Sequence, residues 1–275
     1  MKMKPNRNLL ALGSSLIFLV GTMGQALAAK LDVEFDENDF NWAAAANITN
    51  LYWPLGSGGN SYVYYAESED GCAYNLITVT GNTKNDFNGE YSNVVAREVT
   101  DLEWVDEECN GDHVLTEKTT DWYAQDIIGN IWYFGEETEA YDDEEECPSS
   151  AGAWEAGNAN GAEAGIVLLA NPIAGLAYQQ ELDEGNAEDK GKVLRLDASI
   201  SIELPYESGP VCLKTKEWTP LDTGHVEHKY YCKVADGGVG LMLINELKGK
   251  TVRVEYIGAA LPPGDFPTVG ECPEE

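Results

Sequence analysis

Short runs of alternating or aromatic residues, separated by turns rich in glycine, asparagine and aspartate, recur along most of this chain. A period of two places successive side chains on opposite faces of a β-strand, whereas a helix needs a period near 3.6. Long helical periodicity is absent after residue 28. The pattern predicts a mainly β protein built as an antiparallel meander. Strands are expected at 62–65, 75–80, 92–100, 118–125, 131–135, 192–204, 211–219, 226–234, 240–246 and 251–257.

The second half of the chain repeats motifs of the first. Val95–Thr100 matches Leu213–Thr219 in residue type, and Asp121–Ala124 matches Lys229–Cys232. This degenerate repeat predicts two similar curved antiparallel sheets, or half-barrel-like repeats, joined by an Ala/Gly-rich acidic connector. The expected organisation is a signal peptide at 1–28, an N-terminal repeat with its leading segment at 29–145, the connector at 146–165, a C-terminal repeat at 166–258 and an irregular tail at 259–275.

The first residues have the order of a secretory signal peptide. A basic start at 2–7 precedes an apolar run at 9–20, and Ala26–Ala28 offers the small residues that a signal peptidase reads. The apolar run is shorter than the roughly 20 residues that span a bilayer, and no later segment reaches that length. We expect cleavage after Ala28, no transmembrane segment in the mature chain, and a periplasmic or extracellular location.

The chain is strongly acidic, with a formal charge of −31. Removal of residues 1–28, which carry three positive charges and no acid, leaves −34. A surface of this sign repels nucleic acid and anionic lipid headgroups, so no nucleic-acid partner is expected. A solvated acidic surface is the simplest interpretation, and an acidic secreted protein that binds calcium or copper is the alternative.

The six cysteines all follow the predicted cleavage site, and their even number predicts up to three disulfides in an oxidising compartment. Cys212 and Cys232 lie symmetrically about Asp222, in the turn between the strands predicted at 211–219 and 226–234. Directly opposed residues of a hairpin bring their Cβ atoms within bridging range, so this pair is predicted to form a disulfide. The remaining cysteines, whose pairing stays open, are Cys72, Cys109, Cys147 and Cys272.

An aromatic hairpin is predicted at 118–125 and 131–135. In its second strand Trp132 and Phe134 share one face and Tyr133 lies on the other, while Trp122 leads the aromatic part of the first strand. Large apolar groups therefore occupy both faces. One face must pack a core, and the other is either covered by the second half or the connector, or binds an apolar ligand. The candidate ligand-binding residues are Trp122, Trp132, Tyr133 and Phe134.

Metal binding and catalysis have weaker support. His225 and His228 are the candidate metal ligands, yet side chains three apart on a strand point to opposite faces unless the turn bends them together. A nucleophile elbow of the type G-x-S-x-G is absent. A hydrolase that uses a pair of carboxylates stays open as an alternative, because 48 acidic residues offer many pairs. The preferred interpretation is a non-enzymatic exported protein that binds a ligand, an apolar small molecule or a cation, or associates with the envelope.

Several strings resemble a family of uncharacterised secreted bacterial proteins. They are Asp121–Asp126, Gly129–Glu136, Trp154–Gly157, Lys216–Leu221 and Val226–Tyr231. The resemblance covers most of the mature chain and implies an exported protein, without implying an activity. Each half also resembles the half-barrel sheets of the LolA/LolB-like lipoprotein carriers. That second resemblance implies a curved antiparallel sheet with an apolar concave face.

Overall fold

Strands dominate the structure, which is a computed structural model. It describes residues 30–31, 34–69, 71–141, 148–202, 211–232, 240–248 and 250–267. The helical elements in these ranges are two single 3₁₀ turns, η1 (Glu37–Asp39) and η2 (Gly89–Tyr91). Within the same ranges, no helix has the length and apolar character needed to cross a membrane. The prediction of a mainly β, antiparallel protein is confirmed.

The N-terminal half forms a five-stranded meander in which each strand pairs with the next. Its strands are β1 (Asn60–Ser68), β2 (Gly71–Lys84), β3 (Ala96–Asp106), β4 (Val114–Gln125) and β5 (Ile131–Ala140). Each overlaps a strand expected from the sequence. The β4–β5 turn is tight because Oδ1 of Asp126 accepts hydrogen bonds from the backbone N–H groups of Ile128, Gly129 and Asn130.

The C-terminal half forms a second five-stranded meander. Its strands are β10 (Lys190–Ser199), β11 (Val211–Trp218), β12 (Val226–Cys232), β13 (Leu241–Lys248) and β14 (Lys250–Gly258). These too overlap the expected strands. Because β14 pairs antiparallel with β1, the two meanders are parts of one continuous 14-stranded sheet. The two-repeat arrangement of half-barrels stays a prediction.

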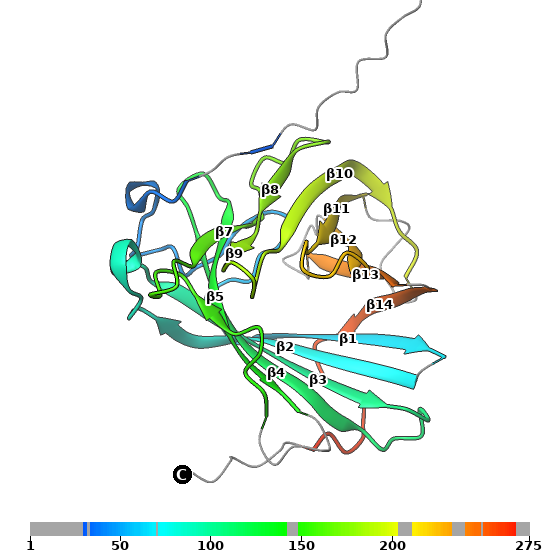
Figure 1. Ribbon diagram of the computed structural model, residues 1–275. Helices are drawn as coiled ribbons and strands as arrows, with labels where there is room; N and C mark the ends of the chain where they lie inside the picture. Colours follow the sequence, from blue (N-terminus) through cyan, green and yellow to red (C-terminus); the bar gives the residue numbers. More distant parts are fainter. Residues whose placement is uncertain are drawn as a thin grey trace, which may run out of the picture.

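Four short strands between the meanders make the sheet nearly closed and barrel-like (Figure 1). They are β6 (Trp154–Glu155), β7 (Glu163–Leu168), β8 (Ala177–Gln179) and β9 (Glu181–Leu182). β7 pairs with β5 and β9 with β7, while β8 pairs with β10. Gly165 permits this approach, since a Cβ there would lie 2.5 Å from the carbonyl oxygen of Gln180. Local composition in this region is loop-like, and pairing with β5 and β10 overrides it.

The N-terminal segment covers the outer face of the β4–β5 hairpin. Phe35 and Phe40 contact Trp132 and Phe134 with ring centroids 5.8–6.1 Å apart. As a result Trp132 and Phe134 are only 2% and 0% exposed. The cover expected from the second half or the connector is therefore supplied by residues that precede β1. Sequence periodicity shows that a strand has an apolar face, but not which distant segment packs on it.

Two disulfides join described cysteines. Cys72 pairs with Cys109 at the β2–β3 end of the sheet, and Cys212 pairs with Cys232. In the β11–β12 ladder Cys212 lies directly opposite Cys232, as the symmetry about the turn predicted. Cys147 and Cys272 lie outside the described residues.

Loss of the β11–β12 disulfide is expected to destabilise the protein measurably. The bridge closes a loop with a sequence separation of 20, so the double substitution Cys212→Ala/Cys232→Ala should lower the free energy of unfolding by about 3 kcal/mol through loop entropy. Urea titration measures this change. Non-reducing peptide mapping should recover Cys212 linked to Cys232, and a Cys212 peptide linked to any other cysteine would contradict the register.

Candidate functional site

A cavity of about 250 Å³ lies on the inner side of the sheet, between the two meanders. Its walls come from β4, β5, β7 and β9 on one side and from β11 and β12 on the other. The segments before β1, β9 and β10 complete the lining. The lining residues are Trp53, Tyr123, Tyr133, Glu136, Val167, Gln180, Glu181, Asp189, Glu217, Lys229 and Tyr231. Aromatic rings and carboxylates thus predominate in the lining.

The aromatic wall is built from strands and from the segment before β1. Tyr123 and Tyr133 are stacked with centroids 4.8 Å apart, because they face each other across the β4–β5 ladder. Trp53 contacts Tyr123 and Tyr231 at 5.4 and 6.1 Å. Its backbone reaches this position only because residue 240 is glycine, since a Cβ there would lie 1.7 Å from the carbonyl oxygen of Tyr52 and 2.7 Å from Cα of Trp53.

Lys229 of β12 is the basic residue of the lining, and two carboxylates of the same half neutralise it. Its Nζ lies 2.9 Å from Oε2 of Glu217 and 3.4 Å from Oε2 of Glu227. Burial lowers the pKa of Lys229, but the two carboxylates outweigh burial and hold that pKa well above the ordinary value. Glu217 also accepts a hydrogen bond from the Thr215 hydroxyl at 2.8 Å. The ammonium is therefore charged and paired with two carboxylates.

Tyr133 connects two carboxyl groups on the opposite wall. Its hydroxyl oxygen lies 2.5 Å from Oδ1 of Asp121 and 3.0 Å from Oε2 of Glu136. A phenol has one proton, so both contacts are hydrogen bonds only if one carboxyl is protonated and donates to the phenol oxygen. Burial, followed by the nearby Asp121, raises the pKa of Glu136 to about 8. Burial raises the pKa of Asp121 to about 6. These shifts make Glu136 the partner that holds the proton more strongly and Asp121 the one that ionises more readily.

Glu181 and Asp189 add further acid groups between Glu136 and Lys229. Burial is the largest cause that raises the pKa of Glu181 well above its ordinary value, followed by Asp189 and then Glu136. Burial also raises the pKa of Asp189, although Lys229 opposes the shift. The described residues place no Lys, Arg or His within ion-pair distance of Glu136 or Glu181. In this part of the cavity the surroundings therefore disfavour the ionised form of the carboxyl groups.

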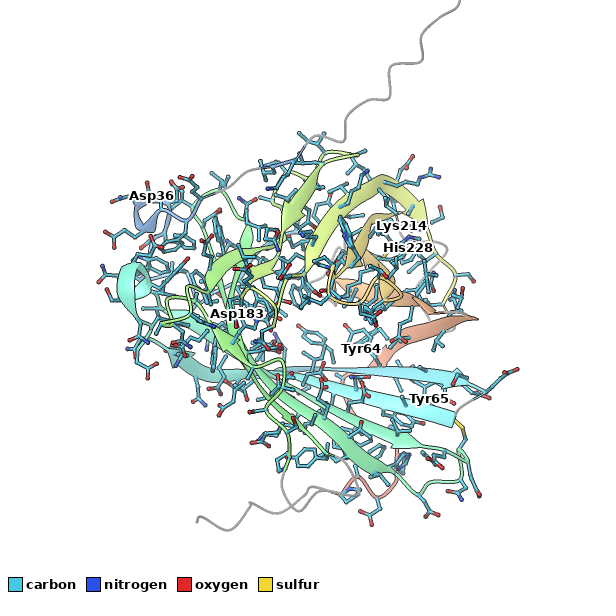
Figure 2. The ribbon with its side chains drawn as sticks, viewed as in Figure 1. Asp36, Tyr64, Tyr65, Asp183, Lys214 and His228 are labelled. Atoms are coloured by element: carbon cyan, nitrogen blue, oxygen red, sulfur yellow. A yellow bond between two sulfur atoms is a disulfide. The ribbon has the colours of Figure 1, made fainter. Side chains whose placement is uncertain are left out.

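A further acid with a buried carboxyl oxygen, Asp101 of β3, faces the interior away from the cavity lining. Burial, then Asp121, raises the pKa of Asp101 to about 7. Its Oδ1 has no hydrogen-bond partner among the described residues. Tyr64, whose pKa is raised first by burial and then by Asp101, lies on the inner side of β1, as Figure 2 shows, and donates to the carbonyl oxygen of Leu241 at 3.0 Å. The acidic character therefore extends beyond the cavity into the interior.

The structure separates the four aromatic residues expected to bind a ligand. Tyr133 lines the cavity. Trp132 and Phe134 lie on the opposite face of β5, under the N-terminal segment, and the Trp132 indole N–H donates to Oδ2 of Asp126 at 3.0 Å. Trp122 packs against Phe87 on that outer side of β4. Strand alternation explains the division, because neighbours along a strand point to opposite faces.

The two histidines expected to bind a metal do not converge. The His225 ring nitrogen Nε2 lies 3.1 Å from Oε1 of Glu227. His228 lies beside Lys214 (Figure 2), and burial, followed by Lys214 and Lys216, lowers its pKa. Across the described parts of the chain, no group of three or more His, Cys, Asp or Glu side chains is arranged to hold a metal ion.

Trp53, Glu181 and Lys229 line the cavity but were not among the candidate residues expected from the sequence. A usable signal existed for Lys229, because Glu227, Lys229 and Tyr231 alternate on one face of a predicted strand, and such charges on a buried face must pair. No local signal marked Trp53 or Glu181, since each reaches the cavity from a segment without strand periodicity.

No family model matches this chain, and neither the curated proteins nor the solved structures include a match.

Proposed function

We propose that this chain is an exported, non-enzymatic binding protein that holds one small ligand in the cavity between its two meanders. The observation that carries the proposal is the lining itself, in which stacked aromatic rings and ionisable groups converge on one concave space. Ligand sites are typically concave, with aromatic walls and a few convergent polar groups. At about 250 Å³ the cavity suits a small molecule rather than an acyl chain.

Export is part of this proposal. The disulfides Cys72–Cys109 and Cys212–Cys232 support it, because disulfides persist in oxidising compartments. The signal peptide at 1–28 lies outside the described residues and is proposed from the sequence alone. The two five-stranded meanders support the inference that the halves are degenerate repeats.

The carboxylates favour a polar ligand over the apolar one that the aromatic hairpin suggested. An apolar ligand in this cavity would remove water from Glu136, Glu181 and Asp189 without replacing their hydrogen bonds, which is costly. A membrane-associated or apolar carrier role therefore has less support than capture of a soluble, polar compound.

A pair of carboxylates also favours a second function, hydrolysis by an acid and a base. Such a pair needs two carboxyl groups with different pKa values, so that one is protonated and the other ionised. Glu136, with a pKa of about 8, and Asp121, with a pKa of about 6, differ in this way. However, Asp121 lies behind the Tyr133 hydroxyl and does not line the cavity. A substrate in the cavity could reach Glu136 but not Asp121, so binding is the better-supported function.

Filling the cavity is expected to abolish ligand binding without unfolding the protein. Val167 lines the cavity, and Val167→Phe places a ring in the space that the ligand would occupy. Native mass spectrometry of protein purified from its own host should show a bound small molecule on the unsubstituted chain and none on Val167→Phe. Trp53 reports on the same event, because it lines the cavity, so release of the ligand should change its fluorescence.

Two controls accompany this test. Trp53→Phe should remove the fluorescence change, whereas Trp104→Phe should keep it, because Trp104 packs against Phe266 away from the cavity. Circular dichroism checks that each variant retains the β fold. A bound molecule that persists on folded Val167→Phe would place the ligand elsewhere and refute the proposal.

A further inference from the structure

The charges of the cavity do not balance. Lys229 is matched by Glu217 and Glu227, which lie on its own side. Glu136 and Glu181 face the same space with no positive partner among the described residues. The indole of Trp154 lies beside Glu181, and that neutral group cannot offset a negative charge. When Glu136 and Glu181 ionise, the described residues of the wall formed by β5 and β9 offer no positive charge to offset them.

Glu181 is the group that most requires a partner. Glu181 is only 9% exposed, and its side chain lines the cavity. A buried carboxylate without a cation must either take up a proton or receive a positive ligand. Burial is the largest cause that raises the pKa of Glu136, Glu181 and Asp189, and the charge of Asp189 adds to the shift at the two glutamates. A positive ligand in this space would favour the ionised form of all three.

The aromatic walls select the kind of cation. The cavity presents Trp53, Tyr123, Tyr133 and Tyr231 around the carboxylates. Ring faces attract an ammonium group through their quadrupole, most strongly when water is excluded. A bare metal ion needs several oxygen or nitrogen ligands at fixed distances, and the described residues hold no such set. Aromatic rings combined with carboxylates instead match an ammonium group that carries carbon substituents.

We propose that the ligand is a small organic cation, a primary amine or a quaternary ammonium compound, whose positive group sits between Glu136 and Glu181 against the rings of Tyr123, Tyr133 and Trp53. This inference rests on the proposed function, because it requires the cavity to be the binding site. The hydroxyl or amide side of such a ligand faces Gln180 and the Lys229–Glu217 pair, which offer hydrogen-bond donors and acceptors.

Matched pairs of probes test the charge directly. Choline and 3,3-dimethylbutan-1-ol share a shape and differ by one positive charge, as do ethanolamine and propan-1-ol. Isothermal titration calorimetry with the disulfide-bonded, cleaved protein should give an affinity at least tenfold higher for one cation than for its neutral counterpart. Equal affinities within both pairs would overturn the inference while leaving the cavity as a binding site, and so would a neutral or anionic molecule recovered from the host-purified protein.

Charge-neutral substitutions locate the contact. Glu181→Gln and Glu136→Gln keep the size of the side chain and should each weaken cation binding at least tenfold, with little effect on the neutral counterparts. Glu139→Gln is the matched control, because Glu139 pairs with Lys118 at a half-exposed position of the sheet and does not line the cavity. If all three substitutions weaken binding equally, the effect is one of overall charge and the proposed contact is wrong.

Proton release on binding distinguishes a direct contact of Glu136 with the cation from a purely structural role of Glu136. Glu136, with its pKa of about 8, is protonated at pH 7 and must lose that proton to accept a cation. Titrations in two buffers with different ionisation enthalpies should therefore show protons released on binding, and the affinity should rise between pH 6 and pH 8. Glu136→Gln should reduce the release, and an unchanged release would contradict the assignment of Glu136. If no probe binds and Val167→Phe leaves the host ligand in place, the proposed function fails together with this inference.

Discussion

The Lys229→Met substitution is expected to be among the most destabilising single changes in this protein, lowering the free energy of unfolding by about 3 kcal/mol at pH 7. It would leave Glu217, which is 5% exposed, without its counter-charge at 2.9 Å. An uncompensated buried charge costs more than the ion pair itself contributes. Breaking a buried ion pair usually costs about 3–5 kcal/mol of stability. We expect the lower end of that range, because the Lys229 side chain is 25% exposed.

Urea titration of three variants checks this expectation. The double substitution Lys229→Met/Glu217→Gln should recover most of the lost stability, because it removes the orphaned charge as well. The control is Lys118→Met, which breaks an ion pair with Glu139 whose side chains are 40% and 36% exposed. It should change stability by at most about 1 kcal/mol. Similar losses for Lys229→Met and Lys118→Met would show that Lys229 is not needed to balance the interior.

Stability is expected to fall as the pH rises from about 5 to about 8, by at least about 2 kcal/mol. Burial raises the pKa of Glu136 to about 8, that of Asp101 to about 7 and that of Asp121 to about 6. In that window the folded chain retains protons that the unfolded chain has released. Proton binding to the folded state stabilises it at low pH, and this contribution is lost as the pH passes each raised pKa.

Carboxyl groups with lowered pKa values limit the gain in stability as the pH falls below about 5. Lys229 and His225 outweigh burial and lower the pKa of Glu227, and Tyr141 and Lys118 lower that of Glu139. Their stabilisation is present above the ordinary carboxyl pKa and is lost below it. Maximum stability is therefore expected in mild acid, around pH 5, rather than at neutrality.

Thermal unfolding across this pH range measures the effect. Glu136→Gln and Asp101→Asn should each flatten the profile, because they replace a titrating carboxyl by a neutral group of similar size. An organic cation bound in the cavity should flatten it as well, by stabilising ionised Glu136. A midpoint that stays constant or rises between pH 5 and pH 8 would show that the interior carboxyls are not held in their protonated form.

The turn and strand pattern of this chain is local and was therefore predictable. Alternation and turn residues located every strand of the two meanders, and the symmetry of Cys212 and Cys232 about their turn identified a disulfide. The short strands β6 to β9 were not expected, because two or three residues in a loop-like composition become strands only when a partner strand is already present.

The strand order along each meander and the two faces of its strands follow from residues that are neighbours in the chain, and the acidity of the protein follows from its composition. Which face of the aromatic hairpin is covered and which is open depends on contacts between segments that are distant in the chain. The N-terminal segment covers Trp132 and Phe134 but leaves Tyr133 facing the cavity. Tertiary structure also defines the candidate site, because the groups that surround a carboxylate determine whether it can bind a ligand. Glu136 of β5 and Glu181 of β9 come from distant segments. The pairing of both strands with β7 brings them to one space, where the described residues hold no counter-charge for them.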